Sequence, residues 1–143
     1  MVNASFRFSH PIRVRWSEVD AQGVVFNPHY LTFADIAVTE YYRAIGMPYP
    51  SAFDVVIADL YARKTQIEYH SSARFDDVLD VYVRVSRLGR SSFEFHIEVL
   101  RVEESIATIV MTYVHANLEK KKSVPLPDKF RDACVRYERV APE

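Results

Sequence analysis

Residues 28–45, with the sequence PHYLTFADIAVTEYYRAI, decide the fold. A proline opens this stretch, Gly46 directly follows it and Pro48 comes soon after, a combination that predicts a helix over 28–45. Four polar residues with a three- and four-residue spacing form one narrow stripe on that helix: Thr32, Asp35, Thr39 and Arg43. Most of the remaining circumference is apolar or aromatic, so we expect other parts of the chain to bury the helix on most sides.

The flanking segments supply the expected cover. Residues 10–16 alternate, with Ile12, Val14 and Trp16 on one face, which predicts a strand before the helix. Alternating or β-branched segments predict further strands at 53–60, 64–70, 78–86, 92–101 and 105–116. Short connections at 88–90 and 103–104 favour hairpins, so the last three strands are expected to form an antiparallel meander.

These elements together predict an α+β fold, with five or six antiparallel strands curled around one long central helix. Residues 128–138 add a short amphipathic C-terminal helix, with Phe130, Cys134 and Tyr137 on one face. The chain has 143 residues and no repeat, low-complexity tract or linker, so we expect residues 1–143 to form a single domain.

The loop that leads into the long helix carries the candidate chemistry. Asp20 stands just before Gly23, and Asn27 and Pro28 are expected to cap and open the helix. A helix start presents unpaired backbone N–H groups and the positive end of the helix dipole. Residues 20–30 can therefore place a carboxylate beside an oxyanion site, which is a plausible hydrolytic centre.

Each candidate residue also has a structural interpretation. Asp20 could be a turn residue, and Gly23 could supply either a special backbone angle or close approach of a substrate. Tyr30 could be a pocket wall or a core residue, and His29 an ordinary residue at the helix start. Structural roles are favoured for four further residues, in strands for the histidines and in salt bridges for the acids: His70, His115, Asp35 and Glu40.

Composition excludes several classes of function. The net charge of −1 argues against a general nucleic-acid binder. Cys134 is the only cysteine, which excludes an internal disulfide and a cysteine-rich metal site. No Gly-x-Ser-x-Gly elbow is present, and no histidine–carboxylate pair has convincing metal spacing. Residues 1–10 lack the apolar run of a signal peptide and no stretch is long enough to span a membrane, so a cytoplasmic protein is expected.

The pattern Asp20-x-x-Gly23-Val24-Val25-Phe26-x-x-x-Tyr30 resembles the 4-hydroxybenzoyl-CoA thioesterase family, and most closely its branch of small bacterial acyl-CoA thioesterases with the hot-dog fold. Residues 39–40, 64–69 and 73–77 also sit where that family places similar residues. The resemblance covers roughly residues 8–128 and departs from the family at one position. Many relatives carry histidine where this chain has Asn27, and a histidine follows two residues later as His29.

The resemblance implies an acyl-CoA thioester hydrolase that uses no metal and no prosthetic group. It assigns the catalytic carboxylate to Asp20 and the oxyanion contact to the backbone amide of Asn27. Family members are dimers joined edge to edge through their sheets, often paired into tetramers, with active sites at the dimer interface. We therefore expect a homodimer or homotetramer that acts on acyl-CoA or on an acyl-carrier protein.

Several choices stay open at this point. Asp20 could attack the thioester as a nucleophile or act as a general base on water. The phosphates of CoA need basic and hydroxyl groups, for which the candidates are Arg63, Lys64, Arg87, Arg90 and Ser91, whereas Lys120–Lys122 is interpreted as a solvated loop. The alternative functions are a hot-dog hydratase or dehydratase of enoyl thioesters, which would use His29, and a non-catalytic acyl-CoA binding module.

Overall fold

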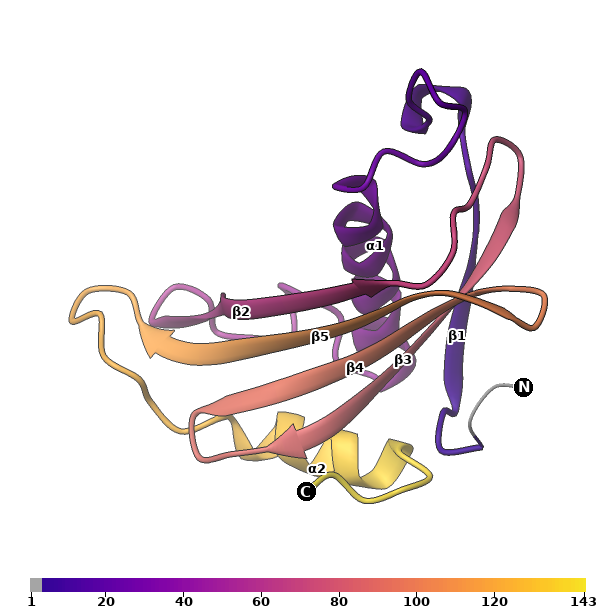
Figure 1. Ribbon diagram of the computed structural model, residues 1–143. Helices are drawn as coiled ribbons and strands as arrows, with labels where there is room; N and C mark the ends of the chain where they lie inside the picture. Colours follow the sequence, from indigo (N-terminus) through magenta and orange to yellow (C-terminus); the bar gives the residue numbers. More distant parts are fainter. Residues whose placement is uncertain (1–3) are drawn as a thin grey trace.

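The computed structural model in Figure 1 describes residues 4–143, so the first three residues of the stretch compared with a signal peptide lie outside it. The strands are β1 (Phe8–Arg13), β2 (Ala58–Tyr69), β3 (Val78–Leu88), β4 (Ser92–Arg101) and β5 (Glu104–Asn117). The helices are α1 (His29–Ala44) and α2 (Asp128–Tyr137), and a short 3-10 turn spans Trp16–Glu18. Among residues 4–143, no helix has the length and apolar content needed to cross a membrane.

The five strands form one antiparallel sheet in the order β1-β3-β4-β5-β2, and α1 lies against one face of it (Figure 1). Side chains that alternate along β3 and β4 turn to this face and are fully buried: Leu79, Val81, Val83, Val85, Phe93, Phe95, Ile97 and Val99. They pack with Phe33, Ala37 and Tyr41 of α1 in one core cluster. The predicted α+β fold and the antiparallel meander are confirmed.

The two strands predicted at 53–60 and 64–70 are wrong as separate elements, because β2 is a single strand. Its pairing with β5 is shifted between Ala62 and Lys64, so Arg63 occupies a bulge. A bulge interrupts the alternation of side chains, which is why one strand looks like two in the sequence. Residues 53–57 form turns instead, closed by a hydrogen bond from the Ile57 N–H to the Asp54 carbonyl oxygen (3.3 Å).

The first strand is also shorter than predicted, since β1 ends at Arg13. Trp16 belongs to the 3-10 turn and is 71% exposed, with its ring edge-on to Phe75, so the prediction that it shares a strand face with Ile12 and Val14 is wrong. The cause is Glu18, which is buried and accepts hydrogen bonds from the Arg15 backbone (2.7 Å) and guanidinium (2.9 Å). These hydrogen bonds hold residues 15–18 in a turn, so the strand does not continue to Trp16.

Helix α1 departs from expectation at its start and on its surface. Pro28 takes the N-cap position and no side chain caps the helix, so the predicted capping role of Asn27 is wrong. The predicted end is confirmed, because Gly46 follows with φ +82°. Leu31 and Ile36 are 39% and 38% exposed, so the expectation that α1 is buried on most sides fails for a single chain. The sheet covers one side of α1 and leaves another open.

Helix α2 is fastened to the core by Glu138, which directly follows it. Buried Glu138 accepts a hydrogen bond from the Tyr41 hydroxyl and one from the Val85 N–H (3.0 Å). Burial raises the pKa of Glu138 and outweighs these two hydrogen bonds, which lower it. Burial also raises the pKa of the neighbouring Cys134 thiol, to about 12. The short terminal helix is therefore part of the core, as its apolar face predicts.

Candidate active site

Asp20 lies in a tight turn that is held by hydrogen bonds to its own carbonyl and carboxylate oxygens. The Gly23 N–H donates to the Asp20 carbonyl oxygen (2.9 Å), and the Gln22 N–H donates to the Asp20 Oδ1 (2.8 Å). Gly23 has φ +79°, a backbone angle that favours glycine. Asp20 is thus a turn residue, yet its second carboxylate oxygen makes no hydrogen bond within residues 4–143. That oxygen is available for chemistry.

This turn borders a hollow of about 310 Å³, here called the Asp20 hollow. Its walls are Asp20, Gln22, Val24, Val25, Asn27, Tyr30, Tyr69, Ser71 and Ser72. Three residues predicted from the sequence, Asp20, Asn27 and Tyr30, are brought together here. The Asn27 N–H makes no hydrogen bond within the described part of the chain, and Asn27 lies two residues before the first residue of α1, next to the positive end of that helix. The hollow is therefore lined by one residue with an unbonded carboxylate oxygen, Asp20, and one with an unbonded backbone N–H, Asn27.

Tyr30 is both core residue and wall. It is 3% exposed, and its hydroxyl oxygen accepts a hydrogen bond from the Ala73 N–H (3.2 Å). Its ring is edge-on to Tyr69, with 5.7 Å between the ring centres. Burial is the largest effect on the Tyr30 hydroxyl and raises its pKa, so this group is a neutral anchor for residues 71–73.

The segment between β2 and β3 forms the opposite wall, and in Figure 1 it rises beside the loop that carries Asp20. The Val25 N–H donates to the Ala73 carbonyl oxygen (2.9 Å), which ties the two segments together. Asp77 fixes the far end through an ion pair with Arg101 (2.6 Å). Burial is the largest single effect and raises the pKa of Asp77, but the hydrogen bonds and charges of Arg101 and Arg74 together outweigh it and hold the pKa below its ordinary value.

Sequence reasoning missed Ser71 and Ser72 as residues of this hollow. Two serines before a strand are ordinary turn residues, so nothing in their type or spacing distinguishes them. The Ser71 hydroxyl donates to Glu104 Oε2 (2.7 Å), which leaves the backbone of residues 71–72 held in place beside the hollow. The only sequence signal for these two serines is their position directly before residues 73–77, one of the segments in which the chain resembles the thioesterase family.

Among residues 4–143, no histidine lines the Asp20 hollow. His29 does not line the Asp20 hollow, and its half-buried ring lies edge-on to Phe26 with 6.0 Å between ring centres. The His70 ring bonds to the Thr108 hydroxyl (2.9 Å), and the His115 ring to the Pro125 carbonyl oxygen (2.9 Å). The structural interpretation of His70 and His115 agrees with these contacts. No group of three or more His, Cys, Asp or Glu side chains within residues 4–143 could hold a metal ion.

The two acids of α1 have different surroundings. Glu40 forms an ion pair with Arg43, one turn further along the helix, so its predicted salt bridge is present. Asp35 has no ion pair among the described residues. Its carboxylate instead borders a separate hollow beside β2.

The predicted CoA-binding residues lie at the other end of the sheet. Ser92, next to the hairpin with Arg87, Arg90 and Ser91, pairs with Val114 of β5, whereas Tyr69 of the Asp20 hollow pairs with Ala107. Val114 and Ala107 are seven residues apart on β5, which corresponds to about 23 Å. A single chain therefore does not bring these basic residues to Asp20.

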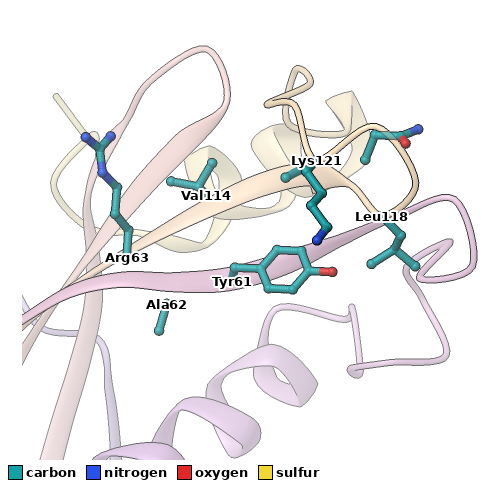
Figure 2. Close-up of a pocket in the computed structure, with 8 residues that line it drawn as sticks. Tyr61, Ala62, Arg63, Val114, Leu118 and Lys121 are labelled. Atoms are coloured by element: carbon teal, nitrogen blue, oxygen red, sulfur yellow. The ribbon is translucent and has the colours of Figure 1, made fainter.

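Arg63 borders a hollow of about 520 Å³ at that same end of the sheet (Figure 2). Tyr61, Ala62, Val114, Leu118 and Lys121 also line it. Lys121 was interpreted as part of a solvated loop, and the structure places it, exposed, at the rim of this hollow. Lys64 does not line it.

One antiparallel sheet packed over one long helix is the arrangement of the hot-dog fold. The chain belongs to the Thioesterase-like superfamily, whose profile matches residues 14–134. The predicted family and hot-dog fold are therefore confirmed.

Named relatives and a solved structure agree with this assignment. The acyl-CoA thioesterase YbgC of Haemophilus influenzae is 28% identical over 126 residues, which cover 88% of this chain and 93% of that protein. A 1,4-dihydroxy-2-naphthoyl-CoA hydrolase of Synechococcus elongatus is 23% identical over 133 residues, covering 90% and 94%. The crystal structure of a 1,4-dihydroxy-2-naphthoyl-CoA thioesterase from Synechocystis superposes with a TM-score of 0.83 at 20% identity, covering 89% and 94% of the two chains.

Proposed function

We propose that this protein hydrolyses acyl-CoA thioesters to a carboxylic acid and free CoA. The observation that carries the proposal is the pairing of a free Asp20 carboxylate oxygen with the free Asn27 N–H in one hollow. The substrate class is supported by the relatives named as acyl-CoA thioesterase and as 1,4-dihydroxy-2-naphthoyl-CoA hydrolase. We further propose that the chain works as one domain in the cytoplasm.

The chemistry needs a nucleophile and a donor for the developing negative charge. With the thioester carbonyl in the Asp20 hollow, the Asn27 N–H and the positive end of α1 stabilise the oxyanion. In one route, Asp20 attacks the carbonyl carbon and CoA thiolate leaves, which forms a mixed anhydride that water then hydrolyses. In the other, Asp20 takes a proton from water as the water oxygen attacks, and the proton passes to the departing CoA sulfur. Both routes require an ionised Asp20.

The substitution Asp20→Asn tests the proposal. We expect turnover of acyl-CoA to fall about a thousandfold, because the amide is neither a nucleophile nor a base. Release of free thiol from a panel of acyl-CoAs and acyl-carrier proteins measures the effect, and thermal unfolding checks the fold. The control is Asp76→Asn, which removes an exposed carboxylate that pairs with Arg13 outside the hollow. A folded Asp20→Asn protein with near-normal turnover would remove Asp20 from the mechanism.

The same panel separates the alternative functions. A hydratase would add water to enoyl-CoA without releasing thiol, and that activity would depend on His29 rather than on Asp20. A binding module would bind acyl-CoA and carry out neither reaction. The hydratase would use His29, and His29 lies outside the lining of the Asp20 hollow.

We also propose that the protein is a homodimer joined through β2, with a pair of dimers as the larger assembly. Within residues 4–143, β2 pairs only with β5, so its other edge is open, and residues 61–66 of this strand are all exposed. Exposed Leu31 and Ile36 on α1 offer apolar surface on the open side of the helix. An open edge with exposed residues is a template for pairing with a second copy.

Self-pairing of β2 would also complete the site. In an antiparallel pair centred on this strand, Tyr69 of one copy faces Ala58 of the other. The end of the second copy's sheet that carries Arg87 and Arg90 then lies on the same side as the Asp20 hollow of the first, and Arg63 faces Lys64 at the centre of the pair. This arrangement supplies cations for the CoA phosphates, because in a single chain the Arg87–Arg90 hairpin lies about 23 Å along β5 from the position that pairs with Tyr69.

A further inference from the structure

Two loops meet at the end of the sheet where β2 begins and β5 ends (Figure 1). They consist of residues 54–57 and 118–122, which we call the β2–β5 tip. The Leu118 N–H donates to the Ile57 carbonyl oxygen (3.1 Å), which ties the two loops together. The Asp54 carbonyl oxygen accepts from the Ile57 and Ala58 N–H groups (3.3 Å each), which holds the first loop in a turn. The tip is therefore one defined surface.

Aliphatic side chains of this tip point to solvent. Val56 is 82% exposed and Ile57 61%, and Leu118 of the second loop is 39% exposed. The ring of Tyr61, 44% exposed, continues this apolar surface onto β2, and Leu118 lies beside it (Figure 2). A single exposed apolar residue is ordinary on a protein surface, whereas neighbouring ones mark an interaction site.

Cations flank the apolar surface. Lys120–Lys122 are exposed, and with Arg63 they take part in no ion pair among residues 4–143. The exposed acids of the tip are Asp54 and Glu119, so its cations are in excess. A nearby third acid, half-buried Asp59, accepts a hydrogen bond from a tyrosine hydroxyl (2.7 Å). The tip is thus both apolar and positively charged, which complements an anionic surface.

The hollow of about 520 Å³ lies within this surface (Figure 2). Tyr61, Val114 and Leu118 supply its apolar walls, and Arg63 and Lys121 supply its charged groups. No acidic side chain of the described residues borders it. The hollow has room for a phosphate-bearing headgroup, which its two cations can pair with.

The types of residue favour a bilayer over a protein as the partner. Protein interfaces are enriched in arginine and aromatic residues and depleted in lysine. The tip instead places three consecutive lysines beside aliphatic side chains at loop ends. Lysines on flexible stems act as point charges that suit a diffuse array of phosphates, and basic segments beside apolar anchors bind anionic leaflets.

The position of the tip relates it to the proposed catalytic site. Ala58 and Tyr69 stand at opposite ends of β2, eleven residues or about 36 Å apart. In the dimer proposed above, the Ala58 end of one copy faces the Tyr69 end of the other. The tip of one chain then lies on the same side of the pair as the Asp20 hollow of the other. A bilayer held there would present acyl-CoA that is dissolved in it through a long apolar chain.

We propose that the β2–β5 tip docks on the surface of an anionic phospholipid bilayer. Val56, Ile57 and Leu118 enter the headgroup region, and Lys120–Lys122 pair with lipid phosphates. Docking of this kind is reversible and weakens in salt, because a few aliphatic side chains and lysines form only a modest anchor. The inference adds a location to the proposed hydrolase and does not alter its chemistry.

Flotation of the full chain with vesicles tests the proposal. We expect the wild type to float with mixed vesicles of phosphatidylcholine and phosphatidylglycerol, but not with phosphatidylcholine alone, and added salt should release it. The combined substitutions Lys120→Gln, Lys121→Gln and Lys122→Gln should weaken binding about a hundredfold, at about fivefold for each lysine. Ile57→Asp should weaken it about tenfold or more, because it removes an apolar anchor and adds a negative charge.

The matched control is Val102→Asp. Val102 is 81% exposed in the turn between β4 and β5, beside Glu103 and Glu104 at the other end of the sheet, so this variant should bind like the wild type. Flotation with both kinds of vesicle alike, or with neither, would overturn the inference, as would an equal loss in Val102→Asp. Light scattering gives the mass of each variant. A changed mass in Ile57→Asp and in the lysine variant would make the tip a contact between copies and would also overturn the inference. Release of thiol from acyl-CoA without vesicles tests the proposed hydrolysis separately.

Discussion

Gly23 shows how a single residue shapes the proposed site. Its φ of +79° is a conformation that side chains other than glycine rarely adopt. An added Cβ would meet no atom within 4 Å, so the requirement for glycine comes from the backbone angle and not from crowding. The turn that this angle permits is the one that holds the Asp20 carboxylate at its hollow.

Replacing Gly23 by alanine should therefore cost conformational energy alone. We expect Gly23→Ala to lower the free energy of unfolding by about 1–2 kcal/mol, the usual cost of left-handed backbone for an L-residue. Gly23→Asn should cost less, because asparagine tolerates this conformation better. Urea unfolding of the three proteins measures both values. Equal losses for alanine and asparagine would contradict a purely conformational role.

At the scale of elements, the attachment of α2 depends on one buried acid. Glu138 receives hydrogen bonds from α1 through Tyr41 and from β3 through Val85, so a single carboxyl group joins three elements. Its other oxygen is buried without a partner, which is unfavourable for the charged form. This environment explains why burial raises its pKa above the ordinary 4.5.

The raised pKa of Glu138 predicts a particular pH dependence of stability. The folded state favours the protonated form of Glu138. The stabilisation that this form contributes to the free energy of unfolding is therefore fully present below about pH 4.5, and it is lost as the pH rises through the folded-state pKa. The glutamine of Glu138→Gln stays neutral at every pH. We therefore expect the free energy of unfolding of this variant to increase relative to that of the wild type as the pH rises. Chemical unfolding from pH 4 to 8 gives this difference. The control Glu103→Gln is exposed and should show no such trend.

Elements with regular periodicity could be predicted from the sequence, and those shaped by local hydrogen bonds could not. β3, β4 and α1 keep their alternation or spacing over most of their length, with shifts in pairing only near the end of β3 (Val85/Arg87) and of β4 (Val99/Leu100), so their predicted bounds agree with the structure within two residues. Trp16 follows the alternation too, but the bonds to Glu18 turn the chain before it. The bulge at Arg63 likewise has no signal in composition, because it is set by the pairing of β2 with β5.

The candidate site divides in the same way. Asp20, Asn27 and Tyr30 are close in the sequence, and one loop and one helix start bring them together. Ser71, Ser72 and Tyr69 reach the same hollow only because Tyr30 and Val25 bond to Ala73, a contact across more than forty residues. Local motifs therefore predicted which of the proposed reacting groups lie together, while the opposite wall required the folded chain.

For the whole molecule, the open edge of β2 gives a direct test of assembly. Thr65 and Gln66 are neighbours, so their N–H groups point to opposite edges of the strand, one toward β5 and one outward. We expect one of Thr65→Pro and Gln66→Pro to give a folded monomer of about 17 kDa, and the other to weaken the fold by breaking the pairing with β5. Light scattering coupled to size exclusion measures the mass. A wild-type monomer, or two folded dimeric variants, would exclude β2 as the interface.

The burial of Cys134 has a practical consequence. With its pKa raised to about 12 and no exposed surface, this single cysteine stays a neutral, unreactive thiol while the chain is folded. A thiol-specific dye will therefore register the CoA that hydrolysis liberates without a background from the protein. Once the chain unfolds, the same dye will label one site per chain, so a single reagent can follow turnover and loss of structure in the same sample.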